Sequence, residues 1–245
     1  MTEVYAVIPD SHGEYDKVAR VIDATQNSIS TYIFEGDIFG GPQPARLVGL
    51  IRDLGERAVS IAGNREWVCR NALNDSNDSS LEVWREDVWP GYERGHRGIL
   101  DSYGVEKSPN WQENAANLRE VMTRNGDLAW LSSLAPYFET DEFVAVHAGP
   151  VLDKPWVVQA TYLDSINTPN GRLEDEPPQI FSHALAAVHD IPASVDNRTF
   201  ITGHSHFHLP IEQRTAERKI CLASNIHNDD PLFVWRSDSG RIHSY

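Results

Sequence analysis

The stretch VYAVIPDSHG, residues 4–13, sets the pattern from which the fold is predicted. Its first half is an apolar run typical of a buried strand, and its second half is a polar turn. A helical pattern follows at 14–25, then a short strand at 32–34, a helix that starts after PQP at 42–44, and a strand at 58–62. Alternating strands and helices predict a layered α/β fold with loops gathered at the carboxyl ends of its strands.

The remainder of the chain indicates one domain with an insertion. The 245 residues, 40% of them apolar, suffice for one sizeable core or two small ones. Residues 74–127 interrupt the rhythm with a polar loop, several Gly and Pro residues, and aromatic side chains that suit either a cap or a small satellite core. The core pattern resumes with helices at 128–134 and 181–188 and strands at 143–146, 200–201 and 219–222. We therefore expect a single domain over 1–245 with a cap-like insertion at 74–127.

Charge and cysteine content restrict the partners and the compartment. Lys and Arg total 21 against 36 Asp and Glu, a net charge of −15 that disfavours long nucleic acids and anionic membranes. Cys69 and Cys221 are too few and too far apart for a disulfide framework or a paired-cysteine metal site. Met1 to Ile8 has no cationic start and too short an apolar run for a signal segment. We expect a cytoplasmic protein.

Five short polar clusters each follow a predicted strand. They are DSHG at 10–13, GD at 36–37, GNRE at 63–66, HAG at 147–149 and GHSH at 203–206. Because the carboxyl ends of strands in such sheets open into one crevice, these clusters can converge there. Together they supply two aspartates, one asparagine and four histidines.

This set of side chains suits divalent transition ions. Carboxylate, amide oxygen and imidazole fit Mn, Fe, Zn, Co or Ni better than a soft thiolate metal. Seven ligands are too many for one ion, but they fit two ions that share a carboxylate, about 3.5–4 Å apart. Each cluster alone also fits a structural role, such as a helix cap, a turn or a satisfied histidine. Their order and their placement after strands favour the metal interpretation.

In this order the clusters resemble the signature blocks D-x-H-G, G-D, G-N-H-D/E, H and G-H-x-H of the calcineurin-like metallophosphoesterases. The resemblance covers the chain outside 74–127, and GDIFGGPQP at 36–44 looks most like a small bacterial branch of predicted phosphodiesterases. It implies a four-layer α-β-β-α sandwich, two mixed sheets flanked by helices, with two divalent metal ions, Mn favoured. The implied ligands are Asp10, His12, Asp37 and His206 for the first ion, and Asp37, Asn64, His147 and His204 for the second.

Two departures from the family pattern bear on the substrate. Arg65 stands where the family has a histidine, and arginine cannot act as a general acid because its pKa exceeds about 12. It can still bind phosphate oxygens as a fork, so the resemblance shifts weight toward phosphodiesters. Gly40-Gly41 replaces the Asp-Arg of protein phosphatases, although Arg94 or Arg97 in the insertion could supply the missing arginine.

The expected function is metal-dependent hydrolysis of a small phosphorylated or nucleotide-like ester, by attack of a hydroxide held between two ions. Asp37, Asn64 and Arg65 are the expected catalytic residues, and Asn64 and Arg65, with Arg94 and Arg97 as candidates, would bind phosphate. The alternatives are a monoesterase similar to protein Ser/Thr phosphatases, or a catalytically weak scaffold that binds a phosphate ligand. The sequence leaves the oligomeric state open.

Overall fold

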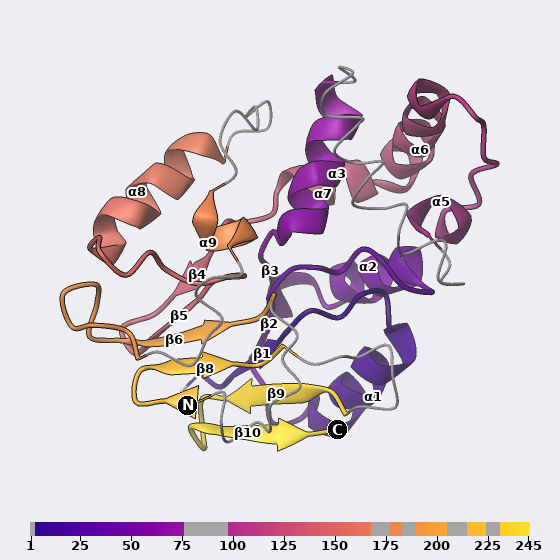
Figure 1. The fold of residues 1–245 in the computed structure, drawn as a ribbon. Helices are drawn as coiled ribbons and strands as arrows, with labels where there is room; N and C mark the ends of the chain where they lie inside the picture. Colours follow the sequence, from indigo (N-terminus) through magenta and orange to yellow (C-terminus); the bar gives the residue numbers. More distant parts are fainter. Residues whose placement is uncertain (1–2, 76–97, 168–176, 183–189, 205–214, 224–230) are drawn as a thin grey trace.

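Two mixed β-sheets form the centre of the protein (Figure 1). The computed structural model describes residues 3–75, 98–167, 177–182, 190–204, 215–223 and 231–245. The first sheet has the order β10-β9-β1-β2-β3, with β1 Tyr5–Ile8, β2 Thr31–Phe34, β3 Ala58–Ser60, β9 Phe233–Arg236 and β10 Arg241–Ser244. The second has the order β4-β5-β6-β8-β7, with β4 Phe138–Glu139, β5 Phe143–Ala145, β6 Thr199–Thr202, β7 Thr215–Ala216 and β8 Lys219–Cys221.

Parallel pairing in both sheets brings several carboxyl ends of strands to the same edge. β1, β2 and β3 pair in parallel, with Tyr5 opposite Thr31 and Tyr32 opposite Ala58. β5, β6 and β8 also pair in parallel, whereas β9, β10, β4 and β7 join antiparallel. The loops after β1, β2, β3, β5 and β6 carry the five polar clusters of the sequence.

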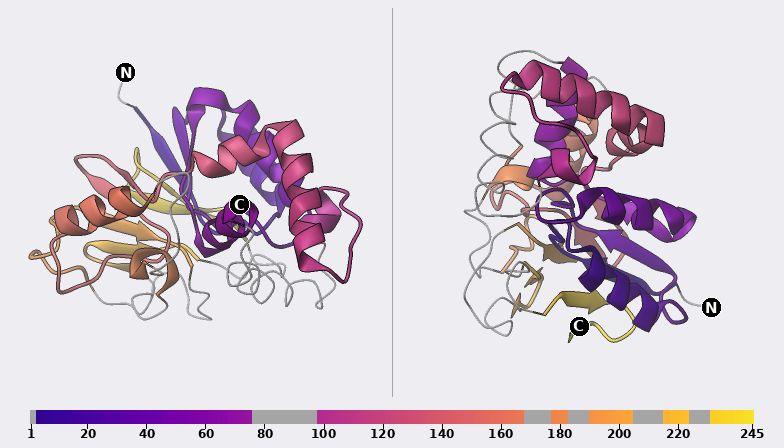
Figure 2. Two further views of the ribbon diagram at one scale, coloured as in Figure 1. Left: turned by 90° about the horizontal axis from the view of Figure 1, so that it is seen from above. Right: turned by 90° about the vertical axis from the view of Figure 1, so that its right-hand side faces the viewer.

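Helices cover the outer faces of the sheets. Their bounds are α1 Tyr15–Thr25, α2 Pro44–Asp53, α3 Asn64–Asp75, α5 Ile99–Ser102, α6 Trp111–Asn125, α7 Asp127–Ser132, α8 Trp156–Ile166 and α9 Pro178–Phe181, with a 3-10 turn at Gly55–Arg57. Figure 2 shows α8 beside the second sheet and α2 and α6 on the opposite side of the molecule. Among the described residues, no helix is both long and apolar enough to cross a lipid bilayer.

The alternation of side chains along each strand builds two layers of core. One face of the first sheet packs against the second sheet through a cluster of Val7, Ile33, Ile61, Phe143, Ala145, Ile201, Ile220, Leu222 and Trp235. The opposite face, with Ile8 and Phe34, packs under helix residues such as Val18 and Leu47. On the outer face of the second sheet, the rings of Trp156 and Phe200 lie 5.3 Å apart, centroid to centroid. The prediction of two mixed sheets flanked by helices is confirmed.

The described residues contain the helices and strands that the sequence predicts for them. The helices expected at 14–25, after 42–44 and at 128–134 are α1, α2 and α7, and the expected strands are β1, β2, β3, β5, β6 and β8. The described part of the insertion forms α5 and α6, and α6 contacts α3 and α7. In that segment Trp111 is half-buried against the helix-side core, whereas residues 76–97 lie outside the described residues. Most of the helix expected at 181–188 also lies outside the described residues.

Candidate functional site

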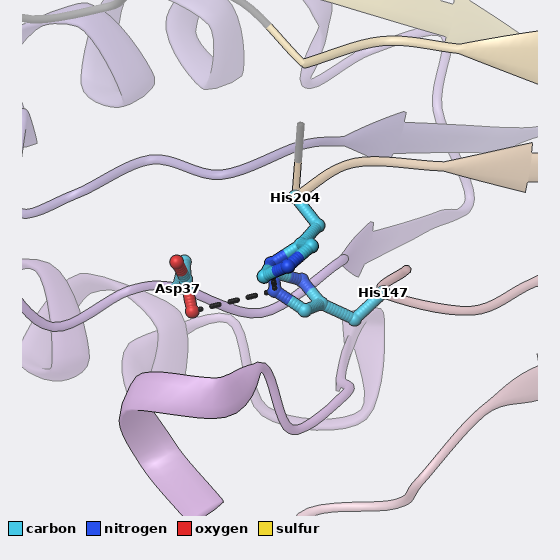
Figure 3. Close-up of side chains that lie close together, drawn as sticks. All are labelled: Asp37, His147 and His204. Atoms are coloured by element: carbon cyan, nitrogen blue, oxygen red, sulfur yellow. Dashed lines mark hydrogen bonds and ion pairs between the residues drawn. The ribbon is translucent and has the colours of Figure 1, made fainter. Parts of the chain in front are cut away.

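Three polar side chains from separate strand ends meet at one point. Asp37 follows β2, His147 follows β5 and His204 follows β6, and Figure 3 shows them directed toward one another. His147 Nε2 lies 3.4 Å from Asp37 Oδ1 and 3.0 Å from His204 Nδ1. One ligand atom from each residue lies within 4.8 Å of the others, and all three side chains are buried. Asn64, the first residue of α3, joins them with Oδ1 at 3.2 Å from His147 Nε2.

The orientation of His147 shows what this cluster can bind. Its Nδ1 lies 2.8 Å from the carbonyl oxygen of Glu35, which can only accept, so Nδ1 carries the proton. The other ring nitrogen, Nε2, then faces a carboxylate, an amide oxygen and a second imidazole. These atoms lie 3.0–3.4 Å from Nε2, close enough for a shared proton or a bound cation to join them. This mixture of oxygen and nitrogen donors fits a divalent transition ion.

Asp10 and His12 border the same cluster from the loop after β1. Asp10 Oδ2 accepts a hydrogen bond of 2.6 Å from the backbone amide of His204, and Asp10 Oδ1 lies 3.3 Å from His147 Nδ1. The backbone amide of His12 donates to the Asp37 carbonyl at 2.7 Å. The Asp10 carboxyl group thus contacts both the His204 loop and the His147 ring. His206, the fourth histidine of the sequence motif, lies outside the described residues.

The backbone of the site is strained at three of these residues. His12, Asp37 and His204 have φ values of 39°, 47° and 66°, a region that residues other than glycine seldom adopt. Glycines make the close approach of the loops possible. A Cβ on Gly63 would lie 2.5 Å from Asp37 Oδ1, and one on Gly203 would lie 2.6 Å from Asp10 Oδ1.

Glu66 ties two of the loops together, a role that the sequence did not reveal. Its buried carboxylate accepts hydrogen bonds from the backbone amides of Asp37 at 2.7 Å, Phe39 at 2.8 Å and Gly63 at 3.0 Å. It therefore fixes the Asp37 loop against the start of α3. The sequence offered one signal, an acidic residue two positions after Asn64.

Comparison with solved structures places this arrangement in a known fold. A candidate diadenosine tetraphosphatase superposes with a TM-score of 0.57 at 16% identity, covering 100% of this chain and 94% of that one. A metallophosphoesterase from Sphaerobacter thermophilus gives 0.51 at 15% identity over 99% and 88%. A protein serine/threonine phosphatase from Saccharomyces cerevisiae gives 0.58 at 13% identity over 99% and 79%. The chain has the calcineurin-like metallophosphoesterase fold. No family model matches the sequence, and no curated protein does.

Arg65 and Gly40, which both depart from the family pattern in the sequence, lie next to one another in this fold. The Arg65 side chain lies over Gly40, so that a Cβ on Gly40 would be 3.0 Å from Arg65 Nη1. Arg65 Nε lies 3.4 Å from Asp37 Oδ2, and its backbone amide donates to Asp37 Oδ1 at 3.2 Å. The glycine at position 40 therefore makes room for the arginine at position 65. Arg94 and Arg97 lie outside the described residues.

Burial and neighbouring charges shift the pKa values of Asp37 and Asp10 in opposite directions. Burial raises the pKa of Asp37, but the imidazoles of His147 and His12 and the Arg65 guanidinium outweigh it and hold the pKa well below its usual range. Burial and the charge of Asp37 raise the pKa of Asp10 well above its usual range. Asp37 is thus the acid of this site that stays ionised beside cationic partners, which a carboxylate needs in order to bind a metal ion.

Proposed function

We propose that the protein is a metal-dependent phosphoesterase that hydrolyses a small phosphate ester, with weight toward phosphodiesters. The observation that carries the proposal is the convergence of Asp37, Asn64 and His204 on His147 Nε2, at 3.0–3.4 Å. Three separate loops and one helix start contribute to it. The metallophosphoesterase fold supports the same reading, since solved structures with this fold include proteins named as phosphatases.

The residues divide into a metal-holding set and a phosphate-binding set. We assign Asp10, His12, Asp37 and His206 to a first divalent ion and Asp37, Asn64, His147 and His204 to a second, with Mn favoured. Bound divalent ions would polarise the phosphoryl oxygens and lower the pKa of an attacking water. Glu35 keeps the His147 ring in the tautomer that presents Nε2, and Glu66 holds the Asp37 loop in place.

Arg65 supports the preference for diesters. Its guanidinium lies beside Asp37 and is 24% exposed in its side chain, so it can fork onto phosphate oxygens bound next to Asp37. It cannot protonate an alkoxide leaving group, because it does not release its proton near neutral pH. Substrates whose leaving group needs no protonation are therefore favoured. The net charge of −15 supports a small phosphorylated substrate rather than a long nucleic acid, and a cytoplasmic location remains part of the proposal.

The experiment compares Asp37→Asn and His147→Ala with the parent protein on bis-(p-nitrophenyl) phosphate and p-nitrophenyl phosphate. Both variants should lose turnover by at least about a thousandfold, because each removes a ligand to the same ion. Asp53→Asn, an exposed position at the end of α2, is the matched control and should keep full activity. Thermal unfolding monitors whether each variant is folded. Retained activity in either ligand variant would exclude the mechanism.

One observation favours a second candidate, a scaffold that binds a phosphate ligand without turnover. The ion pair between Arg65 and Asp37 places a cation on the carboxylate that two metal ions would share. Metal analysis separates the two candidates, since bound metal without turnover under any divalent ion favours the scaffold. Faster turnover of the monoester than of the diester would instead favour a monoesterase similar to protein Ser/Thr phosphatases.

A further inference from the structure

Helix α3 carries three buried donor groups that the proposed chemistry does not use. They are the indole Nε1 of Trp67, the Nη2 of Arg70 and the amide Nδ2 of Asn71, on side chains of residues that are only 1%, 1% and 5% exposed. None of these atoms has a hydrogen-bond partner in the part of the chain that the structure describes. Each is an N–H group that can donate and cannot accept. A buried donor without an acceptor costs about 1–3 kcal/mol, so three together call for a reason.

The three residues share one face of the helix. Positions 67, 70 and 71 are three and four residues apart, the spacing that places side chains next to one another on a helix. The Arg70 guanidinium carbon lies 4.4 Å from the centre of the Trp67 ring, which shows that the arginine extends toward the start of α3. Asn64, the proposed metal ligand, stands at that start, on the same side as Trp67.

Arg70 is a buried cation, and within the described ranges of the chain no carboxylate forms an ion pair with it. Its Nη1 donates to Asn167 Oδ1 at 2.7 Å, and Asn167 Nδ2 donates in turn to the Leu134 carbonyl, which fixes the amide with its oxygen toward Arg70. Burial lowers the pKa of Arg70 to about 10, so the group remains charged near neutral pH. A buried charge without an opposite charge destabilises the folded state through its lost hydration, and an anionic ligand would offset that loss.

We propose that Trp67, Arg70 and Asn71 form a second anion site, which binds a phosphate group of the substrate beyond the one that is hydrolysed. This inference rests on the proposed function and names its substrate class as phosphate esters with more than one phosphate. Arg70 lies six positions after Asn64, an axial rise of about 9 Å between their Cα atoms. An oligophosphate chain can contact both positions with separate phosphate groups. A site made only of N–H donors binds phosphate oxygens, which accept hydrogen bonds, and does not bind ammonium groups or metal ions.

The kinetic test compares ATP with p-nitrophenyl phosphate as substrates of the metal-loaded protein. Arg70→Met should raise KM for ATP about tenfold or more, the cost of one lost charge-assisted hydrogen bond, and should leave kcat for ATP within about twofold. The ratio of kcat/KM for ATP to that for p-nitrophenyl phosphate should fall by the same factor. Arg119→Met is the matched control, because that guanidinium already donates to the Leu73 carbonyl at the end of α3. In Arg119→Met, the ratio of kcat/KM for ATP to that for p-nitrophenyl phosphate should equal the ratio in the parent protein.

A binding test on the metal-free protein does not depend on turnover. Calorimetric titration with tripolyphosphate should give a dissociation constant about tenfold weaker in Arg70→Met than in the parent or in Arg119→Met. Trp67→Phe keeps the aromatic ring and removes only the Nε1 donor, so it tests the site even where Arg70→Met fails to fold. It should weaken tripolyphosphate binding by about threefold to tenfold.

The outcomes separate the two proposals. Unchanged tripolyphosphate binding and unchanged KM for ATP in both variants would overturn the second anion site and leave a phosphoesterase of single phosphates. Absence of hydrolysis with every ester, together with tripolyphosphate binding that depends on Arg70 and Trp67, would overturn the enzyme and support the anion site. Failure of the parent protein to bind tripolyphosphate at all would also overturn the inference.

Discussion

Replacing Gly36 with alanine should destabilise the protein and weaken its metal site together. Gly36 precedes Asp37 and has a φ of +87°, where an L-residue costs about 1–2 kcal/mol. Its new Cβ would lie 2.3 Å from the backbone nitrogen of Gly63 and 2.6 Å from its Cα. These are backbone atoms that cannot turn aside, so overpacking adds about 1–3 kcal/mol. The expected loss in free energy of unfolding is therefore about 2–5 kcal/mol.

Three other glycines separate the two causes within the same chain. Gly63 lacks a positive φ, but its Cβ would lie 2.4 Å from the Asp37 nitrogen, so Gly63→Ala measures the contact alone. Gly104 has a φ of +66° in open space, so Gly104→Ala measures the backbone strain alone. Gly49 lies within α2 with neither feature, and alanine there should stabilise the helix by about 0.5–1 kcal/mol.

Urea unfolding of the metal-free variants measures these differences, and manganese titration of the folded proteins measures the site. From most to least stable, we expect Gly49→Ala, the parent protein, Gly104→Ala and Gly36→Ala, and Gly63→Ala should lie between the parent and Gly36→Ala. Only the Gly36 and Gly63 variants should bind manganese more weakly. A Gly36→Ala protein as stable as Gly104→Ala would refute the reasoning, because the contact with Gly63 would then cost nothing.

Three further predictions concern the acids and the metal. Burial and the charge of Asp10 raise the pKa of Glu35, so the Glu35 carboxyl loses its proton at a lower pH in the unfolded chain than in the folded protein. The free energy of unfolding of the metal-free protein should therefore fall as pH rises above about 4.5, by up to about 1.4 kcal/mol per pH unit. Glu35→Gln should flatten that slope. An identical slope in the variant would contradict the assignment. Glu66→Gln places an amide against backbone donors and should weaken manganese binding about 10-fold to 100-fold, with unfolding free energy lower by about 1–3 kcal/mol; unaltered affinity by titration would exclude its positioning role. Chelation with EDTA should lower Tm by about 5–10 °C relative to manganese at a hundredfold excess over its Kd, and added manganese should restore it; an unchanged Tm would argue against a metal site.

The sequence predicted the elements that have strong local patterns. The apolar run before Asp10 became β1, and helical spacing through Val18 and Val21 became α1. Helix α8 was not predicted, because its valines and its exposed apolar positions give no clear amphipathic period. Strands β9 and β10 were also missed. The place of β9 beside β1 depends on pairing across more than 200 residues, which no local pattern encodes, and β10 joins the sheet only through β9.

By itself, the sequence determined which kinds of side chain follow the strands and, through the resemblance, a two-sheet fold that would bring them together. Only the tertiary structure decided which atoms meet, because convergence depends on strand order, register and the close passage of loops at glycines. His147 faces Asp37 with a defined nitrogen since the Glu35 carbonyl holds its ring, and Glu66 joins two loops through backbone amides that carry no sequence signature. Arg70 likewise stands out only because the structure shows it buried, with no ion pair to another described residue, which composition cannot reveal.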